Sequence, residues 1–234
     1  MKLSIIIPCY NEEKSIKANI EKVKTFLSFK KYDYEIIVVD DGSIDHTSEI
    51  ANSIEGITSL RYGVNQGKGY AVNYGIKHAS GDFVLFMDED LATDLSSIDE
   101  LMKYADEYDM VIGSRHFEGS KILVKQPLKR RFMGWVCRKL VNMKFHLKLD
   151  DTQCGFKGMK IEVARELASR QIIKGFAFDV EYLYFAKLNN LSVKTIPVIW
   201  KDNRDSRVAR GSSMKFIKDM NRIKKNKNNY LYLK

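Results

Sequence analysis

The sequence predicts an α/β fold in which helices cover both faces of a mostly parallel central sheet. Short apolar runs alternate with amphipathic segments through the first half of the chain, as in proteins whose helices connect parallel strands. The apolar runs are continuous, which is typical of strands buried on both faces. Polar clusters at 8–12, 40–43 and 88–90 follow three of these runs. Such sheets bind ligands beyond the carboxyl ends of their strands.

The elements of the first half alternate in order along the chain. Apolar runs predict strands at residues 3–7, 35–39, 58–62, 83–87 and 110–112. Helices are predicted between them, at about 11–27, 45–53, 67–79 and 96–107. The first helix is justified by apolar side chains at helical spacing on one face. They are Ile16, Ile20, Val23 and Leu27.

After residue 113 the regular alternation stops. Residues 114–126 are predicted to be loop, and 151–158 form a polar segment that contains glycine. Helices are predicted at 128–145 and 214–225, a helix or strand-to-helix unit at 175–188, and a strand at 192–200. We expect the last residues, 226–234, to be frayed.

Size and composition restrict the class of protein. With 234 residues, 44% of them hydrophobic, the chain suits one large domain or a domain with an appendage. The three cysteines, Cys9, Cys137 and Cys154, form no metal or disulfide pattern and indicate a reducing compartment. We find no signal peptide and no apolar run near the ~18–20 residues that cross a bilayer. We therefore expect a cytoplasmic protein, peripheral at the inner face of the membrane.

Charge is distributed unevenly along the chain. Residues 1–118 hold 12 Lys/Arg and 21 Asp/Glu, residues 119–149 hold nine Lys/Arg and no acid, and residues 201–234 hold 11 Lys/Arg and three acids. An acidic half beside basic segments predicts one part that handles a metal and another that meets an anion. Nucleic acid, an anionic membrane and a phosphorylated acceptor fit that charge. The acidic half and the lack of a nucleic-acid-binding motif argue against nucleic acid.

An acidic triplet, Asp88, Glu89 and Asp90, closes the strand predicted at 83–87. Where a strand opens into a loop, Asp88 and Asp90 can converge on one ion. Such oxygen ligands suit Mg²⁺ or Mn²⁺, which usually serve substrate phosphates. An acidic turn explains the triplet equally well by itself. The two neighbouring polar strand ends favour a site.

Eight motifs in order resemble family 2 glycosyltransferases of the GT-A fold, which is Rossmann-like. The first half carries SIIIPCYNEE at 4–13, VVDDGSIDHT at 38–47, NQGKG at 65–69 and DED at 88–90. The second half is similar to polyprenyl-phosphate sugar transferases of the dolichyl-phosphate type. It carries GSR at 113–115, DTQCGFK at 151–157, FDVE at 178–181, and Trp200 through SRV at 206–208. The resemblance implies a nucleotide-sugar donor, a divalent cation and inverting transfer.

By this resemblance, the polar strand ends hold the nucleotide sugar. Carboxylates suit ribose hydroxyls and imide N–H groups because they only accept hydrogen bonds. Asp41 fits a structural alternative too, in which it orients the turn or caps the next helix. Asp88 and Asp90 are the expected metal ligands. The expected donor-binding residues are Pro8, Tyr10, Glu12, Asp40, Asp41, Lys68, Asp88, Glu89 and Asp90.

The acceptor phosphate is expected to meet cationic and amide side chains of the second half. A guanidinium offers paired donors that match phosphate oxygens. For each, the alternative is a solvated surface or loop packing. The expected ligands are Arg115, Arg130, Arg131, Gln153, Lys157, Arg204 and Arg207.

Asp179, Arg115 and Arg131 are the expected catalytic residues. For a hydroxyl acceptor, Asp179 would be the general base. A lipid phosphate is already an oxyanion and needs no base, so Asp179 would then orient sugar hydroxyls.

Position 92 departs from the mannose-type relatives, in which a glutamine often helps to hold the metal. Here the residue is Ala92, and Leu91, Ala92 and Thr93 are more similar to the glucose-type relatives. This favours UDP-glucose over GDP-mannose. It leaves the third protein ligand open, and water and donor phosphates can complete the ion's shell.

Many relatives carry membrane-spanning helices beside the catalytic domain, and we expect none within this sequence. We expect a catalytic domain at 1–212 and a basic C-terminal helix and tail at 213–234. The basic helices at 128–145 and 214–225 either lie on an anionic leaflet, with Phe132 and Trp135 in the interface, or pack on the core. A membrane partner protein that presents the carrier is the other arrangement.

Two further alternatives stay open for the activity. One is a soluble family 2 enzyme that acts on a saccharide or protein hydroxyl in cell-surface polysaccharide synthesis. The other is a non-catalytic domain that has kept the fold, against which Asp88 and Asp90 argue.

Overall fold

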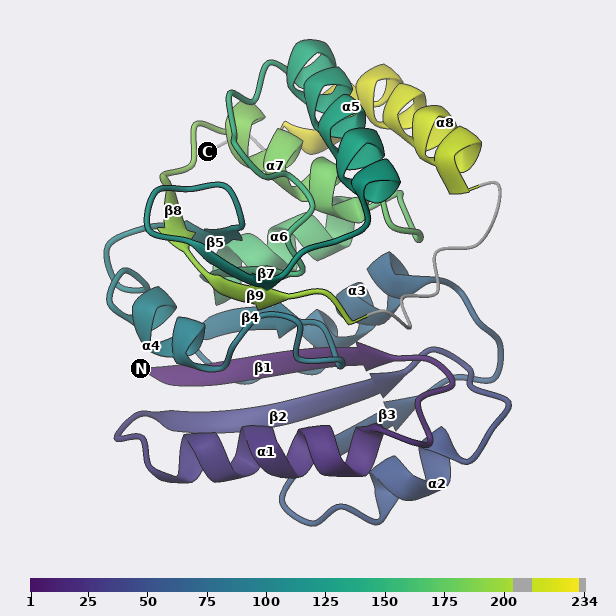
Figure 1. Cartoon of the computed structure of the whole chain (residues 1–234), viewed down its shortest axis with the longest axis vertical. Helices are drawn as coiled ribbons and strands as arrows, with labels where there is room; N and C mark the ends of the chain where they lie inside the picture. The colour runs from purple at the N-terminus through teal and green to yellow at the C-terminus, as the bar shows by residue number, and fades with distance from the viewer. Residues whose placement is uncertain (204–211, 232–234) are drawn as a thin grey trace.

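The computed structural model describes residues 1–203 and 212–231, arranged around a seven-stranded sheet with the order β3-β2-β1-β4-β7-β5-β8 (Figure 1). A second, two-stranded sheet pairs β6 with β9. The strands of the large sheet run parallel except β7, which is antiparallel to both of its neighbours. The predicted α/β fold with a mostly parallel sheet is confirmed. The strands are β1 (Lys2–Cys9), β2 (Asp33–Asp40), β3 (Thr58–Arg61), β4 (Phe83–Met87), β5 (Met110–Ser114), β6 (Lys121–Val124), β7 (Phe156–Lys160), β8 (Val193–Pro197) and β9 (Ile199–Lys201).

Helices cover both faces of the large sheet, because the side chains of each buried strand alternate between two hydrophobic clusters. In β1, Ile5 and Ile7 pack in one cluster and Ile6 in the other. The first cluster lies under α1 (Ile16–Ser28), α2 (Thr47–Asn52) and α4 (Ser96–Met102). The second lies under α3 (Lys68–His78), α5 (Leu128–Phe145), α6 (Ile161–Arg170), α7 (Phe178–Leu188) and α8 (Ser212–Lys225).

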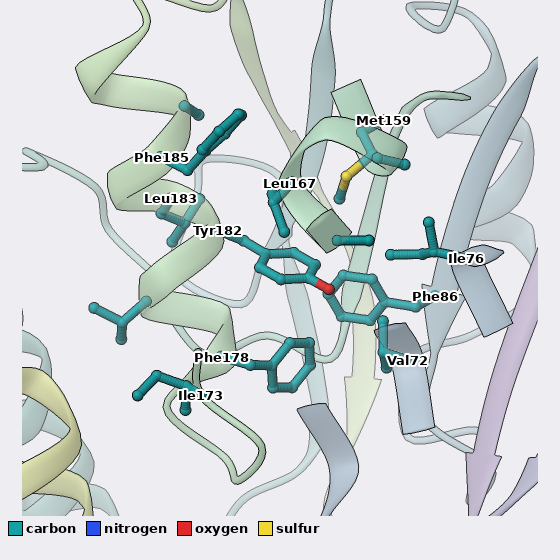
Figure 2. Packing of buried hydrophobic residues seen from close by; sticks show 14 of the residues in the cluster. Val72, Ile76, Phe86, Met159, Leu167, Ile173, Phe178, Tyr182, Leu183 and Phe185 are labelled. Carbon is teal, nitrogen blue, oxygen red and sulfur yellow. The ribbon is translucent and has the colours of Figure 1, made fainter. Parts of the chain in front are cut away.

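Aromatic side chains fix the start of α7 against the sheet (Figure 2). The rings of Phe178 and Tyr182 lie with their centroids 5.3 Å and 6.0 Å from the ring of Phe86 in β4. The Tyr182 hydroxyl donates a hydrogen bond to Gln171 Oε1 at 2.8 Å. Because Asp179 follows Phe178 directly, this packing places its carboxylate close to the carboxyl edge of the sheet.

Part of the second half differs from the sequence prediction. The predicted polar segment at 151–158 enters β7 at Phe156, and the predicted loop at 114–126 contains β6. Helix α6 was not predicted, and the strand predicted at 192–200 divides into β8 and β9. The pattern FKGMK did not predict a central strand, because two lysines and a glycine lower the apolar signal. Lys157 nevertheless lies in the sheet with no exposed surface.

The C-terminal helix α8 packs on the core. Phe216, Met220 and Ile223 belong to the same hydrophobic cluster as α7. The expectation of a frayed end was wrong for the 3-10 turn Lys227–Tyr230, since Tyr230 is buried and donates to Glu181 Oε1 at 2.7 Å. Within 1–203 and 212–231, no helix has both the length and the apolar character to cross a bilayer.

Candidate active site

The three polar clusters meet at one edge of the sheet. In the parallel register Cys9 pairs with Asp40, and β4 lies on the other side of β1. Hydrogen bonds connect the loops that follow: Asn11 N donates to Ser43 Oγ at 2.8 Å, and Ser15 Oγ donates to Glu89 Oε1 at 3.1 Å. The carboxyl ends of β1, β2 and β4 therefore form one continuous polar surface.

Asp40 is almost fully buried at this edge, with 1% of its surface exposed. Its Oδ1 accepts hydrogen bonds from Ser43 N at 2.9 Å and from Ser43 Oγ. Its Oδ2 has no hydrogen-bond partner in the part of the chain that the structure describes, and the nearest cation, Arg61 Nε, is 3.5 Å away. A buried acceptor left over in this way suits an N–H or hydroxyl donor of a ligand. Tyr10, 37% exposed, and the partly exposed Glu12 lie on the loop beside it.

Asp41 supports the structural alternative rather than direct donor binding. Its two oxygens accept hydrogen bonds from Tyr62 Oη at 2.8 Å, Asn65 Nδ2 at 3.0 Å, Gln66 N at 2.7 Å and Gly67 N at 2.9 Å. Both oxygens are thus engaged in holding the loop that leads into α3. These bonds favour the structural role of Asp41, and its donor-binding role stays a prediction.

Lys68 begins α3 and reaches the acidic triplet. Gly67 has φ of 103°, and a Cβ on Gly69 would stand 2.7 Å from Phe178 Cβ, so the start of α3 packs tightly against the start of α7. This places the Lys68 ammonium in an ion pair with Asp88 Oδ1. Burial by itself lowers the pKa of Lys68, but the Asp88 and Asp179 carboxylates outweigh it and raise that pKa.

Gly155 makes room for the Asp88 side chain. A Cβ at this position would stand 2.5 Å from Asp88 Cγ. The backbone also connects the two segments, since Asp88 N donates to the Gly155 carbonyl at 3.2 Å. The close approach of β4 and the 151–155 segment thus requires a residue without a side chain.

The two other acids of the triplet point to different partners. Asp90 Oδ1 accepts from Ala92 N at 3.0 Å, and burial together with the charge of Asp88 raises the Asp90 pKa. Glu89 lies on the α1 side, where it accepts from Ser15 Oγ and from Asn19 Nδ2 at 3.2 Å. Burial, and then the charge of Glu12, raise the pKa of Glu89 to about 7. The donor-binding role expected for Glu89 is therefore not supported by where its carboxylate lies.

Asp88 and Asp90 fit a divalent cation as two oxygen ligands. The raised pKa of Asp90 reflects first its burial and then the neighbouring charge of Asp88, and a cation would relieve both costs. Among the described residues no group of three or more His, Cys, Asp or Glu side chains is arranged to hold a metal. A cation here would therefore take its remaining ligands from water and from a substrate.

Lys157 does not face an acceptor. Its side chain is fully buried and donates to Asp179 Oδ1 at 2.6 Å and to the Cys154 carbonyl at 2.5 Å. Burial raises the Asp179 pKa and outweighs the lowering by Lys157 and Lys68. Lys157 thus compensates a buried carboxylate and holds the 154–155 backbone, and its expected role as a phosphate ligand is corrected.

Arg115 forms a planar ion pair with Asp151, a buried acid for which the sequence analysis predicted no role. Its Nε and Nη2 donate to Asp151 Oδ2 and Oδ1 at 2.7 and 2.9 Å, and its guanidinium lies 5.4 Å from the centre of the Trp200 ring. Burial opposes the charged forms of both groups, but each partner outweighs it, so the pKa of Arg115 rises and that of Asp151 falls. This edge of Arg115 is engaged within the fold, which leaves only its other donors for a phosphate.

The remaining expected acceptor ligands lie in α5, in the segment of Asp151, or outside the described residues. Arg130 Nη1 is 3.8 Å from Asp202 Oδ1, and Arg131 is exposed on the first turn of α5. The partly exposed Gln153 donates its backbone N–H to Asp151 Oδ1 at 3.2 Å. The expected ligands Arg204 and Arg207 fall within 204–211, which the structure does not describe.

The family model of glycosyl transferase family 2 matches residues 4–168 of this chain. The chain belongs to this family. It is a hexosyltransferase, as the resemblance predicted.

Named relatives agree with this assignment, and a solved structure agrees with the fold. A dolichyl-phosphate beta-glucosyltransferase of Trichomonas vaginalis is 33% identical over 94% of this chain and 70% of its own length. The relative of the same name in Dictyostelium discoideum is 33% identical over 95% of this chain and 73% of its own length. Glucosyl-3-phosphoglycerate synthase of Mycobacterium tuberculosis, in a complex with Mn²⁺, UDP-glucose and phosphoglyceric acid, superposes with a TM-score of 0.72 at 17% identity, over 96% of this chain and 80% of its own. This last likeness shows the GT-A fold.

Several residues of the transferase site were missed by sequence reasoning. Asp151 and Gly155 stand in the same motif as Gln153 and Lys157, but the motif does not indicate which of its side chains are buried. Thr152 is buried too, and its hydroxyl has no hydrogen-bond partner among the described residues. The sequence did contain a signal for them. The motif at 151–157, which comes after Arg115 in the chain, includes an acid and a glycine.

Removing the Asp151 charge is expected to destabilise the transferase. Asp151→Asn leaves the mostly buried Arg115 without its counter-charge, which typically costs about 3 kcal/mol of unfolding free energy. Because the folded-state pKa of Asp151 lies below its unfolded value, the pair stabilises the protein above about pH 4 and loses that contribution as the pH falls further. Urea unfolding at pH 7 and in acid measures both effects. Equal stability of the two proteins at pH 7 would contradict this account.

Proposed function

We propose that this transferase moves glucose from UDP-glucose to the phosphate of a polyprenyl carrier of the dolichyl-phosphate type, with inversion and with Mg²⁺ or Mn²⁺. One observation carries the proposal. Eight relatives named dolichyl-phosphate beta-glucosyltransferase align over 86–95% of this chain, so the likeness extends across both the donor half and the acceptor half. Ala92, in place of a further metal ligand, favours the same sugar.

The stereochemistry follows from donor and product. UDP-glucose is an α-glycoside and the relatives' names specify a β-linked product, so a single displacement inverts the anomeric carbon. An oxygen of the lipid phosphate forms the new bond to C1 while the bond from C1 to UDP breaks. The phosphate is already anionic, so no group has to remove a proton. Asp179, held by Lys157, then orients sugar hydroxyls.

Different residues of the chain bind different parts of the nucleotide-sugar donor. The unpartnered Oδ2 of Asp40 accepts a hydrogen bond from the base or ribose, with Pro8, Tyr10 and Glu12 beside it. Lys68 brings a positive charge to the position of the diphosphate. A divalent cation at Asp88 and Asp90, when bound, neutralises the charge that grows on the leaving UDP.

The acceptor phosphate approaches from the side of α5. Arg131 is exposed there, Arg130 lies near Asp202, and the Arg115–Asp151 pair forms the rigid base of this side. Gln153 is the remaining residue that we assign to the acceptor phosphate. Roles for Arg204 and Arg207 remain predictions.

A donor panel tests the proposed activity. The transferase is incubated in detergent with a polyprenyl phosphate and either UDP-glucose or GDP-mannose, with Mg²⁺, with Mn²⁺ or with chelator, and sugar-lipid formation is measured. We expect product from UDP-glucose with metal only. Transfer to a saccharide hydroxyl in place of the lipid phosphate, or undiminished transfer in chelator, would overturn the acceptor or the metal assignment respectively.

Arg131→Ala is expected to weaken use of the acceptor while donor binding is kept. Loss of one charge-assisted contact to phosphate typically costs about 1.5–3 kcal/mol, or roughly 10- to 100-fold in kcat/KM for the acceptor. The control is Lys218→Ala, which removes an equal charge from the exposed surface of α8. Steady-state kinetics with each substrate varied in turn measures the effect. A fall in donor affinity with unchanged acceptor use would show that the acceptor is placed wrongly.

A further inference from the structure

The strand β6 and the first half of α5 carry apolar side chains that the core does not cover. The buried residues of α5 are Val141 and Phe145, both in its second half. We call the uncovered set the apolar face. It consists of Ile122, Leu123, Val124, Leu128, Phe132 and Trp135, and among these Leu128 is 77% and Phe132 63% exposed.

The two parts of the apolar face, in β6 and in α5, are separated by only three residues along the chain. All four residues of β6 are exposed, and the rings of Phe132 and Trp135 stack with centroids 6.2 Å apart. Phe29 and Ile44, which are also exposed, belong to neither β6 nor α5. Grouped apolar exposure of this kind marks an interaction surface, whereas single exposed side chains need no explanation.

The charge around this face selects the partner. Residues 119–149 contain nine Lys/Arg and no Asp or Glu, and Lys121, Lys125 and Lys129 are exposed among the apolar side chains. A second copy of this chain would bring the same cations against them. An anionic phospholipid surface takes both components, because apolar side chains enter the interfacial layer and cations meet the headgroup phosphates.

The apolar face adjoins the acceptor side of the site. Strand β6 pairs with β9, where Ile122 lies opposite Trp200, and Trp200 lies against Arg115. On the α5 side, Arg130 approaches Asp202, which follows β9. A surface bound to this face would therefore lie next to the residues that we assign to the acceptor phosphate.

The structure also separates the two helices that the sequence offered for membrane binding. Helix α8 lies beside α5 (Figure 1), and Lys144 of α5 donates to Asn221 of α8. The apolar stripe of α8, Phe216, Met220 and Ile223, is buried in the core. This stripe is thus not available to a bilayer, whereas the apolar side chains in the first half of α5 are. The exposed apolar side chains of α8 are Met214 and Ile217.

We propose that the apolar face docks on an anionic phospholipid surface and holds the acceptor side of the site at the level of the headgroups. The reason for docking rests on the proposed function, since a polyprenyl phosphate lies in a membrane. The docking itself needs neither donor nor acceptor.

Vesicle flotation without donor and acceptor tests the docking. The probes are phosphatidylcholine vesicles with and without phosphatidylserine, and the variant is Phe132→Ser with Trp135→Ser. We expect wild type to float with the anionic vesicles and to be released by salt, and the variant to bind at least about tenfold more weakly. The matched control, Phe29→Ser, is expected to bind as wild type does. Thermal unfolding confirms that each variant is folded.

Three outcomes would overturn the proposal. The first is that the variant floats as well as the wild type, and the second is that the wild type binds neutral vesicles as well as anionic ones. The third is that neither protein floats, while the wild type is a dimer and the variant is a monomer. Transfer in detergent separates this proposal from the proposed function, because the double variant should keep its activity there. If the wild type transfers sugar in detergent but does not float, only the docking is rejected. If it floats but does not transfer sugar, only the proposed activity is rejected.

Discussion

Asp90→Asn is expected to abolish transfer without destabilising the protein. A neutral amide cannot balance a divalent cation, and loss of the charge that stabilises the leaving diphosphate should lower kcat by about 100- to 1000-fold. Asp88→Asn should have a similar effect on transfer and also removes the counter-charge of Lys68. Transfer assays with saturating Mg²⁺ or Mn²⁺ measure the loss.

The stability of Asp90→Asn provides a separate measurement. Because the pKa of the folded carboxyl is raised by burial and by Asp88, ionisation of Asp90 disfavours the fold increasingly as the pH rises above about 4. The asparagine variant avoids this cost, so its unfolding temperature in chelator at pH 7 should equal or exceed that of the parent. An inactive variant that is also clearly less stable would point to a structural role for Asp90.

The neighbouring Glu89→Gln is the matched control for the triplet. Since the Glu89 carboxylate bonds Ser15 and Asn19 on the α1 side, we expect this variant to retain transfer. A loss as large as that of Asp90→Asn would return Glu89 to the donor site.

Gly155→Ala is expected to impair the site by displacing the Asp88 side chain. The new methyl group would stand 2.5 Å from Asp88 Cγ, so either the carboxylate or the 151–155 segment must shift. Such overpacking typically costs about 1–3 kcal/mol of stability, and displacing the proposed metal ligand Asp88 by an ångström should cost about 100-fold in rate. Unfolding curves and transfer assays measure the two effects.

The control for Gly155→Ala is the same substitution at Gly63, where an added Cβ meets no atom within 4 Å. Gly63→Ala should leave both stability and transfer almost unchanged. If Gly155→Ala behaves like this control, the contact between Gly155 and Asp88 is not needed for the site.

The first half of the site could be predicted because its signals are local. Apolar runs of five or so residues followed by acids predict buried strands with polar ends, and parallel pairing brings those ends to one edge. Glu89 and Asp41 show the limit of this reasoning. Their positions were predicted, but their hydrogen bonds to α1 and to the 62–67 loop depend on where other elements pack.

The second half was predicted less well because its central strand does not look like one. Lys157 lowers the apolar signal of β7, and its burial is tolerated only because Asp179, on another element, supplies a counter-charge. The same holds for Arg115, whose partner Asp151 lies 36 residues further along the chain.

The sequence by itself determined the fold class, the family and the two carboxylates that suit a metal, because strand patterns and motif spacing are local properties of the chain. Only the tertiary structure decided which charges face a ligand and which face each other. It also decided that the apolar side chains in the first half of α5 are exposed, while Phe216, Met220 and Ile223 of α8 are covered. Burial and ion pairing depend on what packs against a side chain, and that information does not lie in any single segment.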